Sequence, residues 1–585
     1  MTRFSVRAPH AAALTLCLFE GDTETRLPMA RDGADWVLET PATPGTQYGF
    51  RADGDWAPEQ GHWFDPAKLL VDPRAVELDG CFIQHPDLAR FGAETATLVP
   101  KAIVPSPMSD APRQPPFFQR GGLIYELNVR GFTKLHHDVP EAQRGTVAAL
   151  AHPKVIAHLK RLRVSAVELM PIVAWIDERH LPPLGLTNAW GYNPVVPMAL
   201  DPRLCPGGVA ELRETVCALH EAGMGVILDI VLNHTGESDT AGGILSLRGL
   251  DNAAYAHAPD GSLINDSGCG NTLDFANPHV RALALETLRH FVRTCGVDGF
   301  RFDLAPVLAR GPGFDANAPI FAEMAADPWL ADRVMIAEPW DIGPGGYQLG
   351  HFPAHWLEWN DRFRDDVRRF WRGDGPIGAL VTRLAGSSDI FGSNCRSVNF
   401  LAAHDGFTLA DTVSYAARHN EANGEENCDG HGENFSWNHG VEGPSLDPDV
   451  RWARGQAQRA MLATLFASTG TILLTAGDEF GRSQRGNNNA YAQDNEIGWI
   501  DWVNRDRALE AFTVRLSARR DAARCAAFPA QGEWTRLDGQ PMHVSDWEEA
   551  GTDGVRFRST DPDRPLSLDI SRSAGKVVRD YGAPA

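Results

Sequence analysis

Eight short, nearly continuous apolar runs lie between residues 120 and 480, and longer segments separate them. Runs of this kind are typical of parallel strands that are buried on both faces. The candidate strands are 124–132, 166–172, 225–232, 299–305, 333–340, 355–360, 397–404 and 471–477. Among the intervening segments, the clearest helical periodicity occurs at 154–163, 209–222, 279–294 and 451–468. Eight strand and helix units predict an α/β fold in which the strands close into a (β/α)₈ TIM barrel.

The regions on either side of this barrel have a different pattern. The first hundred residues alternate apolar and polar in short runs, which predicts an N-terminal β-sandwich. Six prolines in 100–117 exclude a regular helix or a central strand there and indicate a stiff connector. After residue 503 a helix-like stretch at 507–525 precedes short apolar segments, which indicates a small β-rich end. We therefore predict three domains: a β-sandwich at 1–112, the barrel at 113–503 and a C-terminal β-rich domain at 504–585.

Composition excludes several classes of protein and partner. The chain is 43% hydrophobic and 22% charged, as in ordinary folded proteins, so a disordered chain is excluded. Its net charge of -22 would repel nucleic acid and anionic membranes, and we expect neither as a partner. The nine cysteines are scattered without a CxxC pair, so we expect mostly reduced, buried thiols and no zinc site. Because no apolar stretch is long enough to be a signal or a membrane span, we expect a cytoplasmic protein.

Four of the predicted strands end in or beside a carboxylate. These acids are Asp229, Asp303, Glu338 and Asp405. A single acid at a strand end is more often a loop or helix cap, but four at the carboxyl ends of one barrel indicate an active site. Arg301 lies two residues before Asp303 and therefore on the same face of the strand, where it can keep that carboxylate ionised.

Paired carboxylates are what the cleavage of a glycosidic bond requires. One carboxylate, in its ionised form, attacks or stabilises the anomeric carbon, and the other carboxyl group donates a proton to the leaving oxygen. The chain also has 16 tryptophans, several of them near the predicted strand ends, and a sugar ring stacks well on an aromatic face. Long segments rich in Gly, Asn and Asp at 235–275 and 406–450 are typical of binding loops. This combination favours a glycosidase.

The residues around these acids resemble the α-amylase superfamily. Its four motifs are present in order, as 229–234 (DIVLNH), 299–303 (GFRFD), 337–341 (AEPWD) and 403–405 (AHD). The segments that resemble bacterial glycogen debranching enzymes and isoamylases are 188–194 (NAWGYNP), 346–374, 418–427 (RHNEANGEEN) and 477–502. Residues 56–73 are similar to the end of the sandwich domain that precedes the barrel in that family.

The resemblance implies a role for each candidate residue. The catalytic set is Asp303 as nucleophile, Glu338 as general acid and then base, and Asp405 as the acid that stabilises the oxocarbenium-like transition state. The implied substrate-binding set is Tyr192, Asp229, His234, Arg301 and His404. Within this set, Tyr192 would stack beneath the sugar, Arg301 would orient the nucleophile, and the other three would hydrogen-bond the sugar.

One departure from the amylase pattern guides the choice of reaction. Calcium-dependent α-amylases have a Lys-His pair after the nucleophile, where this chain has Pro306 and Val307. We therefore expect no metal or other cofactor, and we expect hydrolysis of α-1,6 branch linkages in glycogen or limit dextrin by a retaining double displacement. The alternatives are a branching-type transglycosylase, a pullulanase-type hydrolase and an inactive glucan-binding relative, although no catalytic acid is lost here.

Overall fold

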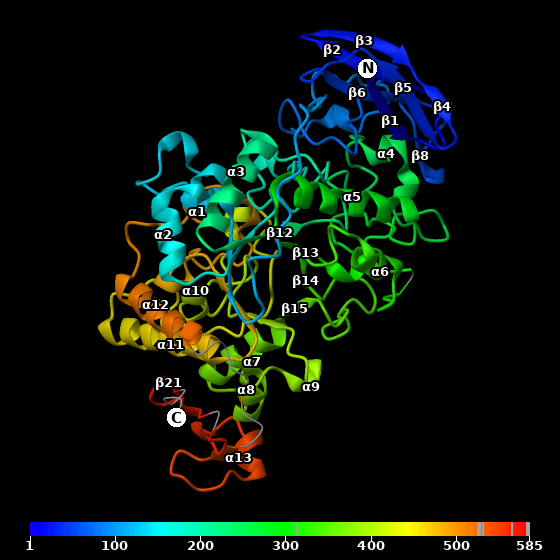
Figure 1. Cartoon of the computed structure of the whole chain (residues 1–585). Coiled ribbons are helices and arrows are strands. Elements are labelled where there is room, and N and C mark those ends of the chain that lie inside the picture. Colours follow the sequence, from blue (N-terminus) through cyan, green and yellow to red (C-terminus); the bar gives the residue numbers. More distant parts are fainter. Residues whose placement is uncertain (312, 523–527, 529–531, 563–564, 581–585) are drawn as a thin grey trace.

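The computed structural model describes residues 1–311, 313–522, 528, 532–562 and 565–580, and its centre is a closed parallel barrel (Figure 1). The barrel strands follow one another in chain order, so the predicted TIM barrel is confirmed. They are β10 (Leu123–Leu127), β11 (Ala166–Leu169), β12 (Gly225–Ile230), β13 (Gly299–Phe302), β14 (Val334–Ala337), β15 (Leu357–Asn360), β16 (Ser397–Asn399) and β17 (Thr471–Thr475).

Every barrel strand except β15 ends earlier than its apolar run predicts. The run at 124–132 contains both β10 and the first helix, α1 (Val129–Thr133), because the Asn128 side chain accepts a hydrogen bond of 2.7 Å from the Gly131 amide and caps that helix. The predicted catalytic acids accordingly lie beyond the paired parts of their strands. Asp303 and Glu338 each follow a strand directly, and Asp405 lies six residues after β16.

The helices that surround the barrel include all four that the periodicity predicts. These four are α2 (Pro153–Arg161), α3 (Gly208–Glu221), α5 (Pro278–Cys295) and α11 (Pro448–Ala467). The longer helices that the periodicity did not single out are α6 (Pro319–Ala326), α7 (Asp361–Arg372) and α8 (Ile377–Leu384). The stretch predicted at 507–525 contains α12 (Arg507–Ala522). Residues 523–525 of that stretch lie outside the described residues.

The N-terminal region is built from two antiparallel sheets, as predicted (Figure 1). One sheet has the order β1-β5-β4 and the other β3-β2-β6-β9. Their strands are β1 (Thr2–Arg7), β2 (Ala13–Glu20), β3 (Thr23–Pro28), β4 (Ala30–Asp32), β5 (Asp35–Thr40), β6 (Gln47–Asp53) and β9 (Ala102–Ile103). Side chains from both sheets form one apolar core, in which the rings of Phe4 and Tyr48 lie 4.9 Å apart. The two-residue β9 lies in the proline-rich connector at a sheet edge, where prolines are tolerated.

The C-terminal sheet packs on the barrel rather than standing apart from it. Its strands are β18 (Gly532–Thr535), β19 (Gly554–Ser559), β20 (Ser567–Ser571) and β21 (Lys576–Asp580). Phe557 and Leu568 from this sheet belong to the same apolar cluster as the barrel core, and β21 lies against α11. The described part of the chain has no helix that is both long and apolar enough to cross a bilayer.

No disulfide links the eight cysteines in the described ranges, and Cys525 lies outside them. The expectation that the thiols are mostly buried is wrong for Cys217, Cys269 and Cys428, which are exposed.

The segment 235–275 is largely packed, so its prediction as a binding loop is wrong for much of its length. Glu237 is buried and accepts hydrogen bonds from the backbone amides of Leu245 at 2.7 Å and Arg248 at 2.9 Å. It also accepts one of 2.6 Å from the Tyr255 hydroxyl. The Val71 amide then bonds the Leu245 carbonyl at 2.8 Å, which joins this segment to the N-terminal sheets. The Gly, Asn and Asp content reflects tight turns around a buried carboxylate.

This arrangement predicts that Glu237 is a stabilising residue. Replacing it with Ala leaves several buried amides and a hydroxyl without an acceptor, so we expect the free energy of unfolding to fall by about 3 kcal/mol. Urea unfolding followed by tryptophan fluorescence measures this change. The matched control is Glu221→Ala, since Glu221 is exposed at the end of α3 and its loss should change stability by less than about 0.5 kcal/mol. Equal effects of the two substitutions would contradict the role given to Glu237.

Candidate active site

A single buried guanidinium joins three of the predicted acids. Arg301 is fully buried on β13, opposite Asp229 on the neighbouring strand β12. Its Nη1 lies 3.0 Å from both carboxylate oxygens of Asp229 and 3.1 Å from Oδ1 of Asp303. Its Nη2 lies 2.9 Å from Oε1 of Glu338. The strand register and one side chain thus bring together acids from β12 and from the ends of β13 and β14.

Asp303 is held by two donors and remains partly open to solvent. Besides Arg301, the Asn233 amide donates to Oδ2 of Asp303 at 2.7 Å and to its backbone carbonyl at 2.9 Å. The Asp303 side chain is 12% exposed, the most of the acids around Arg301. Asn233 was not among the predicted site residues, although it lies in the 229–234 motif that contains Asp229 and His234. An oriented and accessible carboxyl group is what a nucleophile needs.

Glu338 has the surroundings of a proton donor. Burial raises the pKa of its carboxyl to about 8; the charges of Asp303 and Asp405 act in the same direction, and Arg301 opposes them. The Leu304 amide donates to Oε2 at 2.7 Å and fixes the orientation of the group. Leu304 adopts φ 42°, a left-handed conformation that is rare for leucine. The unusual conformation thus occurs at the residue whose backbone amide donates to Glu338. Burial thus keeps the proton on Glu338, whereas the Asp303 side chain beside the same arginine is partly open to solvent.

Asp405 is held from a different part of the chain. Nε2 of His431 lies 3.0 Å from Oδ2 of Asp405. Burial disfavours the carboxylate, but this hydrogen bond and the charges of His431, His404 and Arg364 hold the pKa of Asp405 well below its usual range. His431 belongs to the 406–450 segment, and no sequence pattern singles it out.

Tyr192 and His404 form a stacked pair beside these acids. Their ring centroids are 4.8 Å apart at an interplanar angle of 23°, and the Tyr192 hydroxyl donates to Asp229. Nδ1 of His404 lies 2.7 Å from Oε1 of Glu126 on β10. Burial alone would lower the pKa of His404, but Glu126 reverses this and raises it to about 9, so the ring is an imidazolium. Glu126 was also not selected from the sequence, although it is an acid within an apolar run.

Asp229 and His234 are buried more deeply than Tyr192 and His404. Both oxygens of Asp229 are occupied by Arg301, and Tyr192 adds a further bond. Burial raises the pKa of Asp229 to about 6, with Arg301 acting against the rise and Asp303 adding to it. Nε2 of His234 is 2.9 Å from the Tyr192 carbonyl, and its Nδ1 contacts the Asn233 side chain. Contact of these two residues with a sugar stays a prediction.

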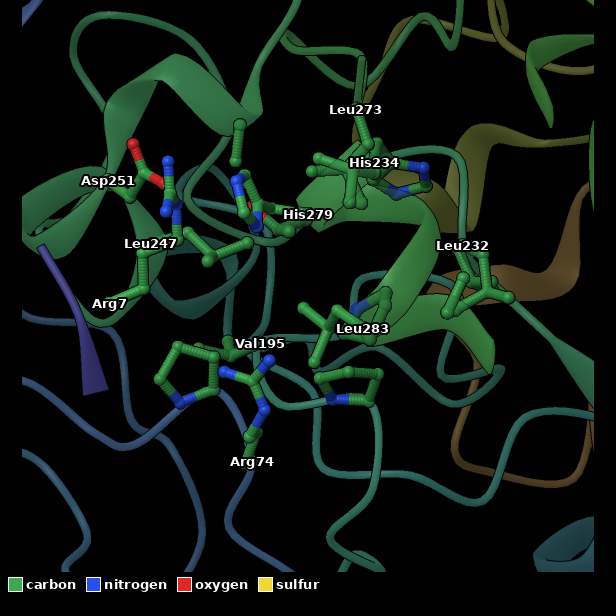
Figure 2. Close-up of a pocket in the computed structure, with 18 of the residues that line it drawn as sticks. Arg7, Arg74, Val195, Leu232, His234, Leu247, Asp251, Leu273, His279 and Leu283 are labelled. Atoms are coloured by element: carbon green, nitrogen blue, oxygen red, sulfur yellow. The ribbon is translucent and has the colours of Figure 1, made fainter. Parts of the chain in front are cut away.

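An apolar pocket lies behind the site, between the N-terminal sheets and α5. Figure 2 shows Leu232, Leu273 and Leu283 around it, with the ion pair of Arg7 and Asp251, 2.9 Å long, at its edge. His234 contributes to its wall, whereas Asp303, Glu338 and Asp405 do not line it. The pocket is therefore separate from the three predicted catalytic acids.

The surroundings of Pro306 and Val307 contain no set of metal ligands in the structure. Both residues are buried in the 3₁₀ helix η7 (Ala305–Ala309) that follows β13. Within the described ranges, no group of three or more His, Cys, Asp or Glu side chains is arranged to hold a metal ion. Independence from metal stays a prediction that needs a chelation experiment.

Comparison with known proteins identifies close relatives along nearly the whole chain. Residues 1–75 match the family model for carbohydrate-binding module 48, the isoamylase N-terminal domain. The glycogen debranching enzyme of Serratia proteamaculans is 46% identical, with 93% of this chain and 87% of that protein covered. The glycogen debranching enzyme of Cronobacter sakazakii is 45% identical, with 95% and 89% covered.

Solved structures share the same fold at lower sequence identity. The pullulanase from Bacillus acidopullulyticus aligns with a TM-score of 0.70 at 20% identity, covering 97% of this chain and 67% of that one. The pullulanase from Anoxybacillus sp. LM18-11 complexed with maltotetraose aligns with a TM-score of 0.71 at 22% identity, covering 97% and 80%.

The raised pKa of Glu338 predicts an alkaline limit to catalysis. A general acid must hold its proton, and burial keeps this proton in place up to a pH of about 8. We therefore expect the rate of glucan cleavage to fall as the pH rises through about 8. Glu338→Gln, which cannot donate a proton to the leaving oxygen, should be inactive on glucan at every pH. Initial rates measured across the pH range test both expectations.

An α-maltosyl fluoride provides the control, since fluoride departs without a proton. Glu338→Gln should still release one equivalent of fluoride per enzyme, because attack by Asp303 does not need the acid. Failure of the variant to release fluoride, or a wild-type rate that stays flat through pH 8 to 10, would contradict the acid role of Glu338.

Proposed function

The chain belongs to the family of glycogen debranching enzymes, and on that premise we propose how its barrel hydrolyses the α-1,6 branch linkages of glycogen. The observation that carries the proposal is the contact of Arg301 with Asp303 and Glu338. One guanidinium contacts both the accessible Asp303 side chain and the Glu338 carboxyl group, which burial keeps protonated, and a retaining mechanism requires such a pair of acids.

In the first step Asp303 attacks the anomeric carbon of the branch chain. The bond from that carbon to the 6-oxygen of the main-chain glucose breaks, and Glu338 donates its proton to the departing oxygen. A covalent glucosyl ester on Asp303 and a free main-chain hydroxyl result. Asp405 stays ionised because of His431 and stabilises the positive charge that develops on the sugar in the transition state.

In the second step Glu338, now a carboxylate, takes a proton from water. The water oxygen attacks the anomeric carbon from the side that the main chain has left, and the ester bond to Asp303 breaks. Because two inversions occur at the same carbon, the released branch chain has the α configuration. Glu338 is again protonated, and Asp303 is again a carboxylate held by Arg301 and Asn233.

Tyr192 and the groups around it are proposed to bind the glucose unit at the cleaved bond. The face of the Tyr192 ring that His404 does not cover offers a flat apolar surface for a sugar. Because Nδ1 of His404 is bonded to Glu126, the nitrogen proposed to donate to a sugar hydroxyl is Nε2. Asp229 and His234 complete the proposed set at a deeper level. The substrate is a branched α-glucan, consistent with the maltotetraose bound in a pullulanase of the same fold.

The remaining parts of the proposal concern organisation and location. We assign residues 1–112 to a carbohydrate-binding-module-like domain, 113–503 to the catalytic barrel and 504–585 to a C-terminal domain. We also propose that the enzyme acts in the cytoplasm without a nucleic-acid or membrane partner, given its net charge of -22. A branching-type transglycosylase would use the same acids and would transfer the branch to another sugar, so product analysis separates the two reactions.

Digestion of two polymers tests the proposed specificity. From glycogen we expect short linear α-1,4 chains, released initially as the α anomer, and we expect little product from pullulan. Chromatographic separation by chain length, with NMR of the anomeric proton, measures both results. Asp303→Ala is the control, since loss of the covalent route should lower the rate by on the order of 10³ or more without unfolding the protein. Initial β product would contradict the retaining mechanism, and transfer of branches without a gain in reducing ends would indicate a transglycosylase.

Chelation tests the proposed independence from metal. With Pro306 and Val307 in place of the Lys-His pair, we expect enzyme treated with EDTA to keep most of its debranching activity. We also expect unbranched amylose to be a poor substrate. Loss of activity in EDTA that calcium restores, or cleavage of amylose as fast as glycogen, would favour an amylase instead.

A further inference from the structure

Two segments singled out by their resemblance to debranching enzymes, 418–427 and 477–502, have no part in the mechanism described above. The structure brings them together beside Asp405 through a cluster of asparagines, here called the amide clasp: Asn420, Asn423, Asn487, Asn488 and Asn489. We propose that the amide clasp makes His431 a positioning residue that holds Asp405 in its catalytic orientation. This inference rests on the catalytic role proposed for Asp405.

The amide clasp is a buried network with reciprocal bonds. The Asn420 side chain donates to Oδ1 of Asn488 at 2.8 Å and accepts from the Asn488 backbone amide at 2.9 Å. The Asn487 side chain donates to Oδ1 of Asn423 at 2.9 Å, and Asn423 donates to the Asn489 carbonyl at 2.8 Å. Asn420, Asn423, Asn487 and Asn488 are at most 1% exposed. A network with its members satisfied in this way is rigid and fixes one geometry.

Asn488 holds both partners of the contact between His431 and Asp405. Its side chain donates to the His431 carbonyl at 2.9 Å. Its backbone carbonyl accepts from the amide of Gly406, the residue after Asp405, at 2.9 Å. One residue of the amide clasp therefore sets the relative position of the imidazole and the carboxylate.

The backbone next to His431 is fitted closely to the amide clasp. Gly430 has φ 74°, and a Cβ atom there would lie 2.4 Å from Oδ1 of Asn488. A side chain at this position would have both a clash and an unfavourable backbone conformation. Because Gly430 has no side chain, the backbone beside His431 can pack directly against Asn488, and this close packing helps to place His431.

His431 is also the only side chain in the described ranges that hydrogen-bonds the Asp405 carboxylate. Asp303 has two such donors, Arg301 and Asn233, and Glu338 accepts a hydrogen bond from the Leu304 backbone amide and forms an ion pair with Arg301. Removal of His431 would leave Asp405 free to rotate about its side-chain bonds. Because the sugar cation must meet a fixed charge, such rotation affects the transition state more than substrate binding.

The expected effect appears in kcat. His431→Ala should lower kcat for glycogen by roughly 10- to 100-fold while KM changes less than twofold, since misplacement of a catalytic group by about 1 Å has an effect of this size. His431→Gln retains an amide donor and should recover part of the loss. The control is His419→Ala, because His419 lies in the same segment with Nε2 3.0 Å from Glu442 and has no bond to Asp405. Thermal unfolding should be unchanged in the His431 variants.

A double-mutant cycle with Asp405→Asn separates positioning from general damage. The rate of fluoride release from an α-maltosyl fluoride is measured for the wild type, both single variants and the double variant. We expect His431→Ala to have less than a twofold effect in the Asp405→Asn background. An equal loss in both backgrounds, or an equal loss from His419→Ala, would overturn the proposal. Because this assay does not use the natural glucan, failure of the debranching assignment can be distinguished from failure of the role proposed for His431.

Gly430→Ala tests the contribution of the amide clasp. The clash with Asn488 should displace His431 and lower kcat as His431→Ala does. The double variant Gly430→Ala with His431→Ala should lose no more activity than His431→Ala alone. Additive losses would overturn the link between the amide clasp and His431.

Discussion

The buried charge of Arg301 is the constraint on which the site depends. A fully buried guanidinium is stable only when carboxylates pair with it, and here Asp229, Asp303 and Glu338 all contact it. Loss of any of these acids changes the charge that the others experience. The same arrangement gives the acids different surroundings, because burial keeps the proton on Glu338 while Arg301 and Asn233 donate hydrogen bonds to Asp303. The contacts that bring the proposed catalytic acids together therefore also stabilise the buried charge of Arg301.

A second buried ion pair lies beside Tyr192. Glu126 on β10 balances the positive charge of His404, and Thr475 donates a hydrogen bond of 2.7 Å to the other carboxylate oxygen of Glu126. Glu168 on β11 lies next to Glu126 in the strand register and is fully buried; burial and the nearby carboxylates raise its pKa well above the usual range, so it is neutral. The floor of the site thus contains ion pairs and a neutral acid rather than unpaired charges.

Local patterns were enough to predict the barrel and the four acids near its strand ends, but not Asn233 or Glu126. The period of two placed Arg301 beside Asp303, and apolar runs located all eight strands, although the runs continued into the loops that carry the acids. His431 could not be predicted in this way, because it lies in a segment without periodicity and meets Asp405 only through tertiary contacts. The composition of 235–275 suggested a loop, since nothing local reveals that the Glu237 carboxylate is buried among backbone amides.

The two sources of support for the acids differ in how freely they can change. Asp303 and Glu338 are fixed by Arg301 inside the barrel, where a substitution leaves an unpaired buried charge. Asp405 is instead hydrogen-bonded by His431, whose side chain is 43% exposed and is not part of the barrel core. On the role proposed for Asp405, a change that displaces His431 is therefore expected to alter turnover while the contacts of Arg301 remain intact, because the two sources of support share no residue.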